Sequence, residues 1–72
     1  MVNTTMLNKK IDESGLKRGY IANELNMSRQ SLFAKVNNST EFLSSEVQQL
    51  CKILGITVLA EKEAIFFADE VD

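Results

Sequence analysis

The chain has 72 residues, a net charge of −2 and a sequence pI near 5.0. This length suits one small domain, and a hydrophobic content of 44% is too high for a disordered chain. The sequence has no histidine, no glycine-rich phosphate loop and no nucleophile–base pair, so we expect no enzyme, small-molecule substrate, cofactor or metal site. A single cysteine and the lack of a long apolar run predict a cytoplasmic protein that does not enter a membrane.

The charge is unevenly distributed along the chain. Residues 1–40 carry six basic and three acidic side chains, a net +3, whereas residues 41–72 carry two basic and seven acidic side chains, a net −5. A dedicated DNA-binding domain usually has a pI above about 9. Any polyanion binding must therefore use a local patch in the first half, and it should be weak at physiological salt.

Apolar residues recur at helical spacing along most of the chain. Leu7 and Ile11 predict a first amphipathic helix, which begins with Thr4 or Thr5 as its cap and ends at Gly15.

A short second helix is predicted from Lys17 or Arg18, with Ile21, Ala22 and Leu25 on its apolar face. Asn26 is expected to end it, because Asn tolerates a positive φ better than most residues. Ser28 is the expected cap of a third helix.

The polar run 37–41 predicts a loop, after which Ser44 or Ser45 is expected to cap a fourth helix. The spacing of its apolar residues is the clearest helical pattern in the chain, formed by Val47, Leu50, Cys51 and Leu54. Cys51 is expected to be an inert core thiol. The remaining stretch is ambiguous, because LAEKEA suits a short helix while AIFFA is rich in residues that favour a strand.

The third helix has an unusual outward face. At about 100° per residue, Leu32 and Val36 fall together on the core side. Arg29, Gln30, Phe33, Ala34 and Asn37 then share the outward side. An aromatic ring at the centre of that side is a surface liability or a contact residue.

The predicted order of short helix, turn and third helix is the layout of a helix-turn-helix, whose second helix enters the DNA major groove. Arg29 and Gln30 suit guanine and adenine, and Phe33 suits a thymine methyl group. Arg18 and Lys35 are placed to meet phosphates. The same face could instead dock on a protein, since an aromatic side chain surrounded by Arg, Gln and Asn is a common interface anchor.

Two stretches carry a resemblance to a known family. GLKRGYIANELNMSRQSLFAKVNN and the later SSEVQQLCKILGI resemble the lambda-repressor/Cro-like helix-turn-helix domains of phage regulators, over about residues 5–57. Phe42, the run Lys35-Val36-Asn37 and the terminal IFFADEVD are similar to a small subgroup from phages of Gram-positive bacteria. Phe33 and Ala34 stand where that family commonly has polar base readers, and Asn38 stands where it often has glycine.

The resemblance implies an all-α domain of four or five helices at residues 1–57. A C-terminal tail at 58–72, helical or extended, would pack on the domain or on a partner. It implies a phage antirepressor that binds the phage's main repressor and blocks or redirects its operator binding; the alternative is a Cro-like homodimer that binds operator DNA itself. The candidate DNA- or partner-binding residues are Arg18, Ser28, Arg29, Gln30, Phe33, Ala34, Lys35, Asn37 and Asn38, and Phe66 and Phe67 are candidate tail contacts.

Overall fold

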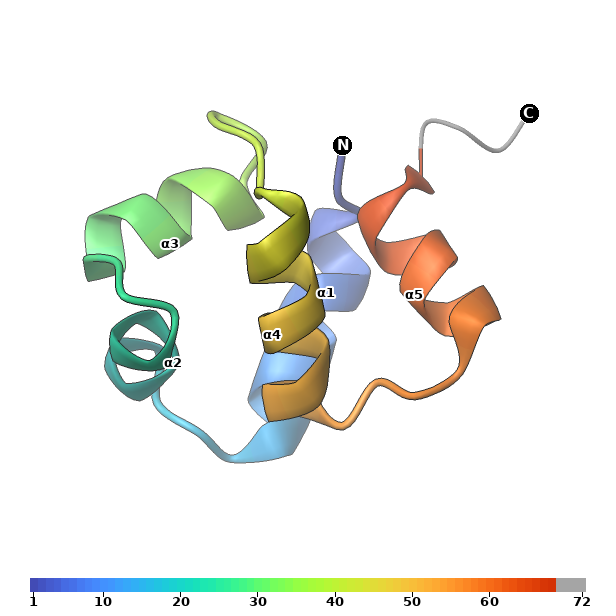
Figure 1. The fold of residues 1–72 in the computed structure, drawn as a ribbon, viewed down its shortest axis with the longest axis horizontal. Helices are drawn as coiled ribbons and strands as arrows, with labels where there is room; N and C mark the ends of the chain where they lie inside the picture. The colour runs from blue at the N-terminus through green and yellow to red at the C-terminus, as the bar shows by residue number, and fades with distance from the viewer. Residues whose placement is uncertain (69–72) are drawn as a thin grey trace.

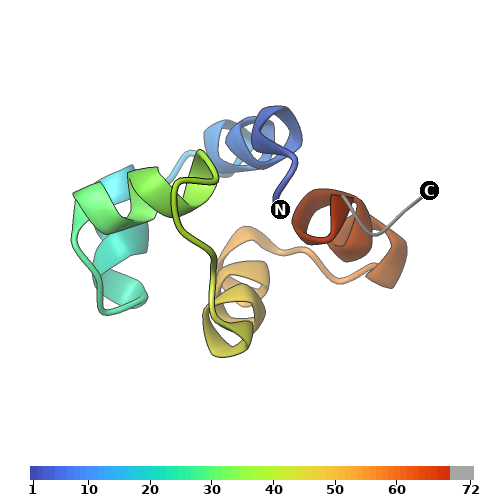
Figure 2. The same cartoon turned by 90° about the horizontal axis from the view of Figure 1, so that it is seen from above.

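A computed structural model describes residues 1–68, which form five α-helices and no strand within that range. The helices are α1 (Thr4–Ser14), α2 (Arg18–Glu24), α3 (Arg29–Val36), α4 (Ser44–Leu54) and α5 (Leu59–Phe66). Helix α1 contacts α3, α4 and α5, and α2 packs against α3 (Figures 1 and 2). This confirms the all-α prediction. Within residues 1–68 no helix has both the length and the apolar character needed to cross a bilayer.

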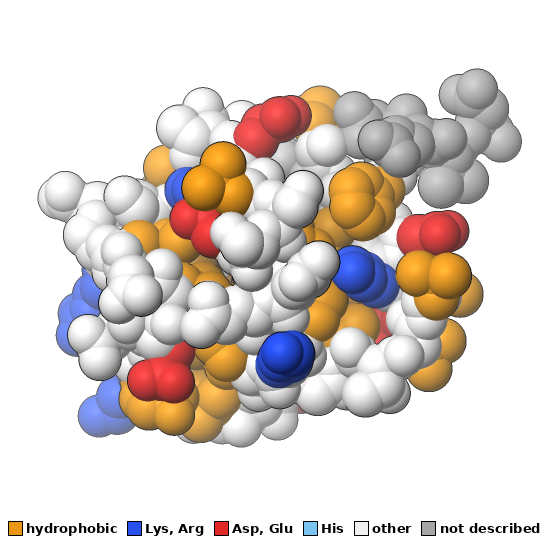
Figure 3. Space-filling model, in the orientation of Figure 1, with side chains coloured by type: hydrophobic (Ala, Val, Ile, Leu, Met, Phe, Trp, Pro, Cys, Tyr) orange, Lys and Arg blue, Asp and Glu red, His pale blue; other side chains and the backbone are white. Residues whose placement is uncertain are grey.

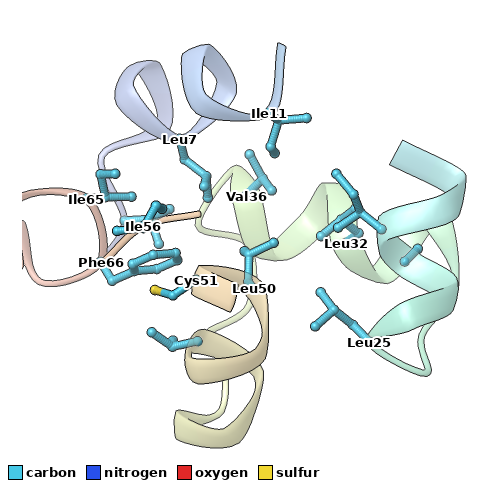
Figure 4. Close-up of a cluster of buried hydrophobic side chains, with 14 residues drawn as sticks. Leu7, Ile11, Leu25, Leu32, Val36, Leu50, Cys51, Ile56, Ile65 and Phe66 are labelled. Carbon is cyan, nitrogen blue, oxygen red and sulfur yellow. The ribbon is translucent and has the colours of Figure 1, made fainter. Parts of the chain in front are cut away.

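The core is built from residues of all five helices (Figure 4). Its largest fully buried side chains are Leu7, Ile11, Ile21, Leu32, Leu50 and Ile65. Burying one such side chain stabilises the fold by about 1.5–3 kcal/mol. Most of these residues lie on the apolar stripes that the sequence predicts, so helical periodicity located the core correctly.

The turns of the helix-turn-helix follow the predicted chemistry. Asn26 has a φ of 56°, and the Met27 N–H donates to the Ala22 carbonyl at 3.0 Å. The Ser28 hydroxyl then accepts a hydrogen bond from the Ser31 N–H at 3.1 Å, which caps α3. The direction of α3 relative to α2 is therefore fixed by backbone and cap hydrogen bonds as well as by packing.

Two helix caps differ from the prediction. Asn3, and not Thr4 or Thr5, caps α1 by accepting a hydrogen bond from the Met6 N–H at 3.1 Å. Leu43, and not Ser44 or Ser45, occupies the cap position of α4. Its N–H donates to the Glu46 carboxylate at 2.8 Å, so the acidic residue of the first turn supplies the cap interaction.

The stretch after Gly55 contains helix α5, so the extended alternative for AIFFA is wrong for residues 64–66. Ile65 and Phe66 are buried, and the Phe66 ring meets the Phe42 ring edge-on at a centroid distance of 5.9 Å. Phe67 remains 36% exposed. Residues 58–66 therefore complete the core of the domain, and the end of the predicted tail, at 69–72, lies outside the described residues.

The first residues of the chain form a strap between α3 and α5 (Figure 1). The Asn38 side chain accepts from the Val2 N–H at 2.8 Å and donates to the Val2 carbonyl at 3.0 Å. The next residue, Asn3, donates its N–H to the Ile65 carbonyl at 2.6 Å. The end of α3 and the end of α5 are thereby linked through the N-terminus.

Candidate functional site

A surface groove of about 870 Å³ lies along the helix-turn-helix. Helix α3 forms one wall with Arg29, Gln30, Phe33 and Asn37. Leu32 and Val36 lie beneath this wall and turn their side chains into the core (Figure 4). The rest of the groove comes from α1, through Asn8 and Asp12, and from the start of α2, through Lys17, Arg18 and Gly19. We call this the α2–α3 groove.

Phe33 is the most exposed large apolar side chain in the described part of the chain. It is 70% accessible, whereas its neighbours Leu32 and Val36 are 1% and 4% accessible. The sequence-based phase of α3 is therefore confirmed. An exposed ring beside a groove is an unsatisfied apolar surface, and covering it would release about 1.5–3 kcal/mol.

Arg29 bends back over α2 instead of extending away from the protein. A methyl group added at the Cα of Gly19 would lie only 2.7 Å from Nε and 2.9 Å from Nη2 of Arg29. The missing side chain at position 19 therefore makes room for the guanidinium. Arg29 forms no ion pair with any acidic residue in 1–68, so its charge is available to a partner.

Arg18 stands at the rim of the groove, and two of its nitrogen atoms already have partners within the protein. Its Nη1 lies 3.3 Å from the Asp12 carboxylate, and its Nη2 donates to the Asn8 side-chain oxygen at 2.9 Å. Both charged side chains remain substantially exposed, so this surface pair can exchange partners at small cost.

Lys35 faces away from the groove. Its Nζ lies 2.6 Å from the Glu46 carboxylate, and both side chains are only 16% exposed. Burial acts to raise the pKa of Glu46, but the hydrogen bonds from Lys35 and from the Leu43 N–H outweigh it, and the pKa lies below its usual value of 4.5. Lys35 thus joins α3 to α4 and is not presented for a phosphate contact.

The acid side of this interaction gives a testable pH dependence. Because the folded-state pKa of Glu46 is depressed, its contribution to stability is complete above pH 4.5 and is lost as the pH falls through the lowered value. We expect Glu46→Gln to reduce the unfolding free energy by about 1 kcal/mol at pH 7 and by clearly less at pH 3. Urea unfolding followed by circular dichroism measures both values.

The exposed Glu41 provides the control for that experiment, since Glu41→Gln should change stability little at either pH. A Glu46→Gln penalty of equal size at pH 7 and pH 3 would contradict the assigned role of the carboxylate.

Of the remaining candidate residues, some lie in the groove and others have structural roles within the fold. Gln30 and Asn37 are exposed beside Phe33, and the Asn37 amide donates to the Phe33 carbonyl at 2.9 Å. Ala34 is half-buried, Ser28 acts as the α3 cap, and Asn38 binds Val2. In the tail, Phe66 is a core residue, and Phe67 retains some exposure near the strap.

Sequence reasoning missed the α1 and Gly19 side of the groove. Asn8 and Asp12 lie on the polar face of α1, and nothing in their spacing indicates that this face meets the start of α2. Gly19 reads as an ordinary glycine, because its role depends on where the Arg29 side chain lies. The sequence indicates Lys17 only as a possible start of the second helix, and the structure adds it to the groove as a third basic residue.

The α2–α3 groove thus combines an exposed aromatic ring with three basic side chains and one acidic side chain. An open apolar wall with charges at its rim is a lining that a macromolecular partner could cover. Comparison of the chain with models of known protein families, with curated proteins and with solved structures found no match.

Proposed function

We propose that this protein is a phage antirepressor of the lysis–lysogeny switch. It binds the phage's main repressor through the α2–α3 groove and blocks or redirects the repressor's operator binding. The phage assignment comes from the sequence resemblance to lambda-repressor/Cro-like regulators. The observation that carries the choice of a protein partner is the 70% exposure of Phe33 at the centre of the outward face of α3.

Phe33 is a better anchor for a protein than for DNA. Fully burying the ring against a partner's apolar side chains would use its whole surface, and aromatic residues at the centre of an interface often dominate its binding energy. A thymine methyl group covers only a small part of such a ring. The polar neighbours Gln30 and Asn37 can form the hydrogen-bonding rim that surrounds an interface core.

The charges of the surface also favour a protein partner. DNA affinity grows with the number of phosphates that are neutralised by Lys and Arg. Of the two predicted phosphate contacts, Lys35 is held in a shielded pair with Glu46, whereas the exposed Arg18–Asp12 pair can still exchange partners. The chain as a whole carries a net charge of −2, so it has no overall positive charge to attract DNA at long range.

A Cro-like operator-binding function is the second candidate, and one observation favours it. Arg29 and Gln30 stand exposed in the first turn of α3, which is the part of a helix-turn-helix that reads base edges. If DNA is the target, Arg29→Ala should weaken operator binding by about 1–3 kcal/mol and relax one base preference.

A gel-shift experiment at moderate salt distinguishes the two candidates. The purified protein is mixed with DNA from beside its own gene, with and without the neighbouring repressor. The antirepressor proposal expects no specific shift by this protein alone, and loss or alteration of the repressor's shift when both are present. A specific shift by this protein alone, with no effect on the repressor's shift, would favour the Cro-like alternative.

Gly19 allows a prediction in which stability and binding move in opposite directions. Gly19→Ala should stabilise the fold by about 0.5 kcal/mol, because alanine favours a helix more than glycine does. The added methyl group would displace the Arg29 guanidinium from its place over α2. We therefore expect repressor binding to weaken about tenfold, which is about 1.4 kcal/mol, as measured by isothermal titration calorimetry.

The double variant shows whether both effects act through Arg29. If Gly19 acts by positioning the Arg29 guanidinium, the double variant Gly19→Ala, Arg29→Ala should bind the repressor about as well as Arg29→Ala alone. Additive losses would mean that the methyl group disturbs the partner directly, and the positioning role would be wrong.

A further inference from the structure

A second groove lies between the end of α4 and the start of α5. It has a volume of about 380 Å³, and its apolar lining includes Cys51, Ile56, Val58 and Leu59. Helix α5 stands on the opposite side of α4 from the α2–α3 pair (Figure 1). None of these residues lines the α2–α3 groove, so the α4–α5 groove is a separate surface.

The groove opens beside two adjacent exposed apolar side chains. Val58 is 61% accessible and Leu59 is 66% accessible. Single exposed apolar residues are common, but this neighbouring pair lines one groove and forms a patch there, beside the polar and basic residues of the same groove. Helix capping does not account for Val58, which occupies the cap position of α5 and makes no side-chain cap hydrogen bond, where Ser, Thr, Asp or Asn would stabilise the helix.

Two lysines border the same groove, Lys52 from α4 and Lys62 from α5. Neither forms an ion pair with an acidic residue in 1–68, and the same holds for Lys9 and Lys17, whereas Lys10 and Lys35 are both paired. Figure 3 shows blue side chains over α4 and α5 with orange surface between and beside them. Lys52 and Lys62 are the only two basic residues in 41–72, a stretch with seven acidic residues. The positive charge of that half of the chain is therefore concentrated at the α4–α5 groove.

We propose that the α4–α5 groove binds a short acidic segment of a partner protein that carries an apolar side chain. The apolar side chain covers Val58 and Leu59, and the carboxylates of the segment pair with Lys52 and Lys62. Charge complementarity selects this occupant, because an acidic segment supplies the partners that these two lysines lack among the described residues. This second surface does not depend on the antirepressor function and leaves the α2–α3 groove free.

The test uses the full chain, labelled with ¹⁵N, in an NMR titration at low salt. The probe is an acetylated and amidated hexapeptide, Glu-Asp-Leu-Leu-Asp-Glu, and the matched control is its neutral counterpart, Gln-Asn-Leu-Leu-Asn-Gln. We expect saturable shifts at the end of α4 and the start of α5. The neutral peptide should bind about fivefold more weakly, as two exposed ion pairs would predict.

A Lys52→Gln, Lys62→Gln double variant separates the groove from general charge. Both side chains border the groove and lie outside the buried core, so the spectrum should remain that of a folded protein, and affinity for the acidic peptide should fall about fivefold. A Lys9→Gln variant, whose side chain lines neither groove, controls for general charge and should bind the peptide like the natural chain.

Four results of the peptide titrations would overturn the proposal. These are no perturbation of groove resonances by the acidic peptide, perturbation confined to α2 and α3, equal binding of both peptides, or unchanged affinity in the double variant. Groove resonances that shift with protein concentration in the absence of peptide would show that a second copy occupies the surface, and the assigned partner would be wrong.

Discussion

Phe33→Ala is expected to weaken the complex between this protein and the phage repressor by about 30-fold or more, a loss of about 2 kcal/mol. The ring is the most exposed large apolar group of the described chain and stands on the wall of the α2–α3 groove. Its truncation removes the apolar surface that a partner would cover. Isothermal titration calorimetry of the purified pair measures the effect.

Leu43→Ala provides a matched control for that measurement. Leu43 is 62% exposed, close to the value for Phe33, and lines none of the described grooves. Its truncation should leave repressor affinity within about threefold of the natural value, and neither change should alter the unfolding free energy by more than about 0.5 kcal/mol. Equal affinities for Phe33→Ala and the natural chain would remove Phe33 from the interface and leave Arg29 and Gln30 as the remaining groove candidates.

The face of α3 could be predicted from the sequence because it depends on local periodicity. Leu32 and Val36 are one helical turn apart, so both had to lie on one side, and Phe33 had to lie about 100° away. Asn26 and Ser28 were equally accessible to prediction, since a left-handed turn residue and a hydroxyl cap act on their own neighbours. The structure confirms each of these assignments.

The sequence could not show in the same way which polar side chains face the groove and which bind other parts of the protein. Lys35 and Glu46 are 11 residues apart, and Asn38 and Val2 are 36 residues apart. These interactions form only once α3 has packed beside α4 and the N-terminus. The helical periodicity of α3 predicts on which side of that helix Lys35 lies. It does not predict that Glu46 of α4 lies next to Lys35, because that contact depends on how the two helices pack.

The ambiguity of AIFFA has a related cause. Isoleucine and phenylalanine favour strands when the surrounding structure is unspecified. Here Ile65 and Phe66 are buried side chains of a helix that packs on α1, and Phe66 also contacts the Phe42 ring. Tertiary packing therefore overrides the intrinsic preference. The boundary expected at residue 57 divides a unit that shares one core.

The N-terminal strap connects α5 to α3, the helix that carries the candidate site. Asn38 follows α3, holds both backbone polar groups of Val2, and adopts a φ of 65°. Asn3 then binds the Ile65 carbonyl of α5. A change that destabilises α5 should consequently destabilise the end of α3. Helix α3 forms one wall of the α2–α3 groove, so the groove should be affected as well.

Ile65→Ala is expected to destabilise the protein by about 2–5 kcal/mol, because the side chain is fully buried among helices and its removal leaves a cavity. A domain this small has a modest total stability, so much of the variant should be unfolded at ambient temperature. Urea unfolding followed by far-ultraviolet circular dichroism measures the loss. Ile65→Val, with an expected cost of about 0.5–1.5 kcal/mol, keeps the comparison measurable if the alanine variant does not fold.

Leu59→Ala tests whether that loss comes from the core and not from weakening of α5 as a helix. Leu59 belongs to the same helix but is 66% exposed, so its truncation should change stability by no more than about 0.5 kcal/mol. If the Ile65 variants are no less stable than Leu59→Ala, residues 58–66 are a dispensable tail. If the expected difference is found, α5 is part of the same cooperative unit as the helix-turn-helix, and chains ending at residue 57 should fail to present a folded α2–α3 groove.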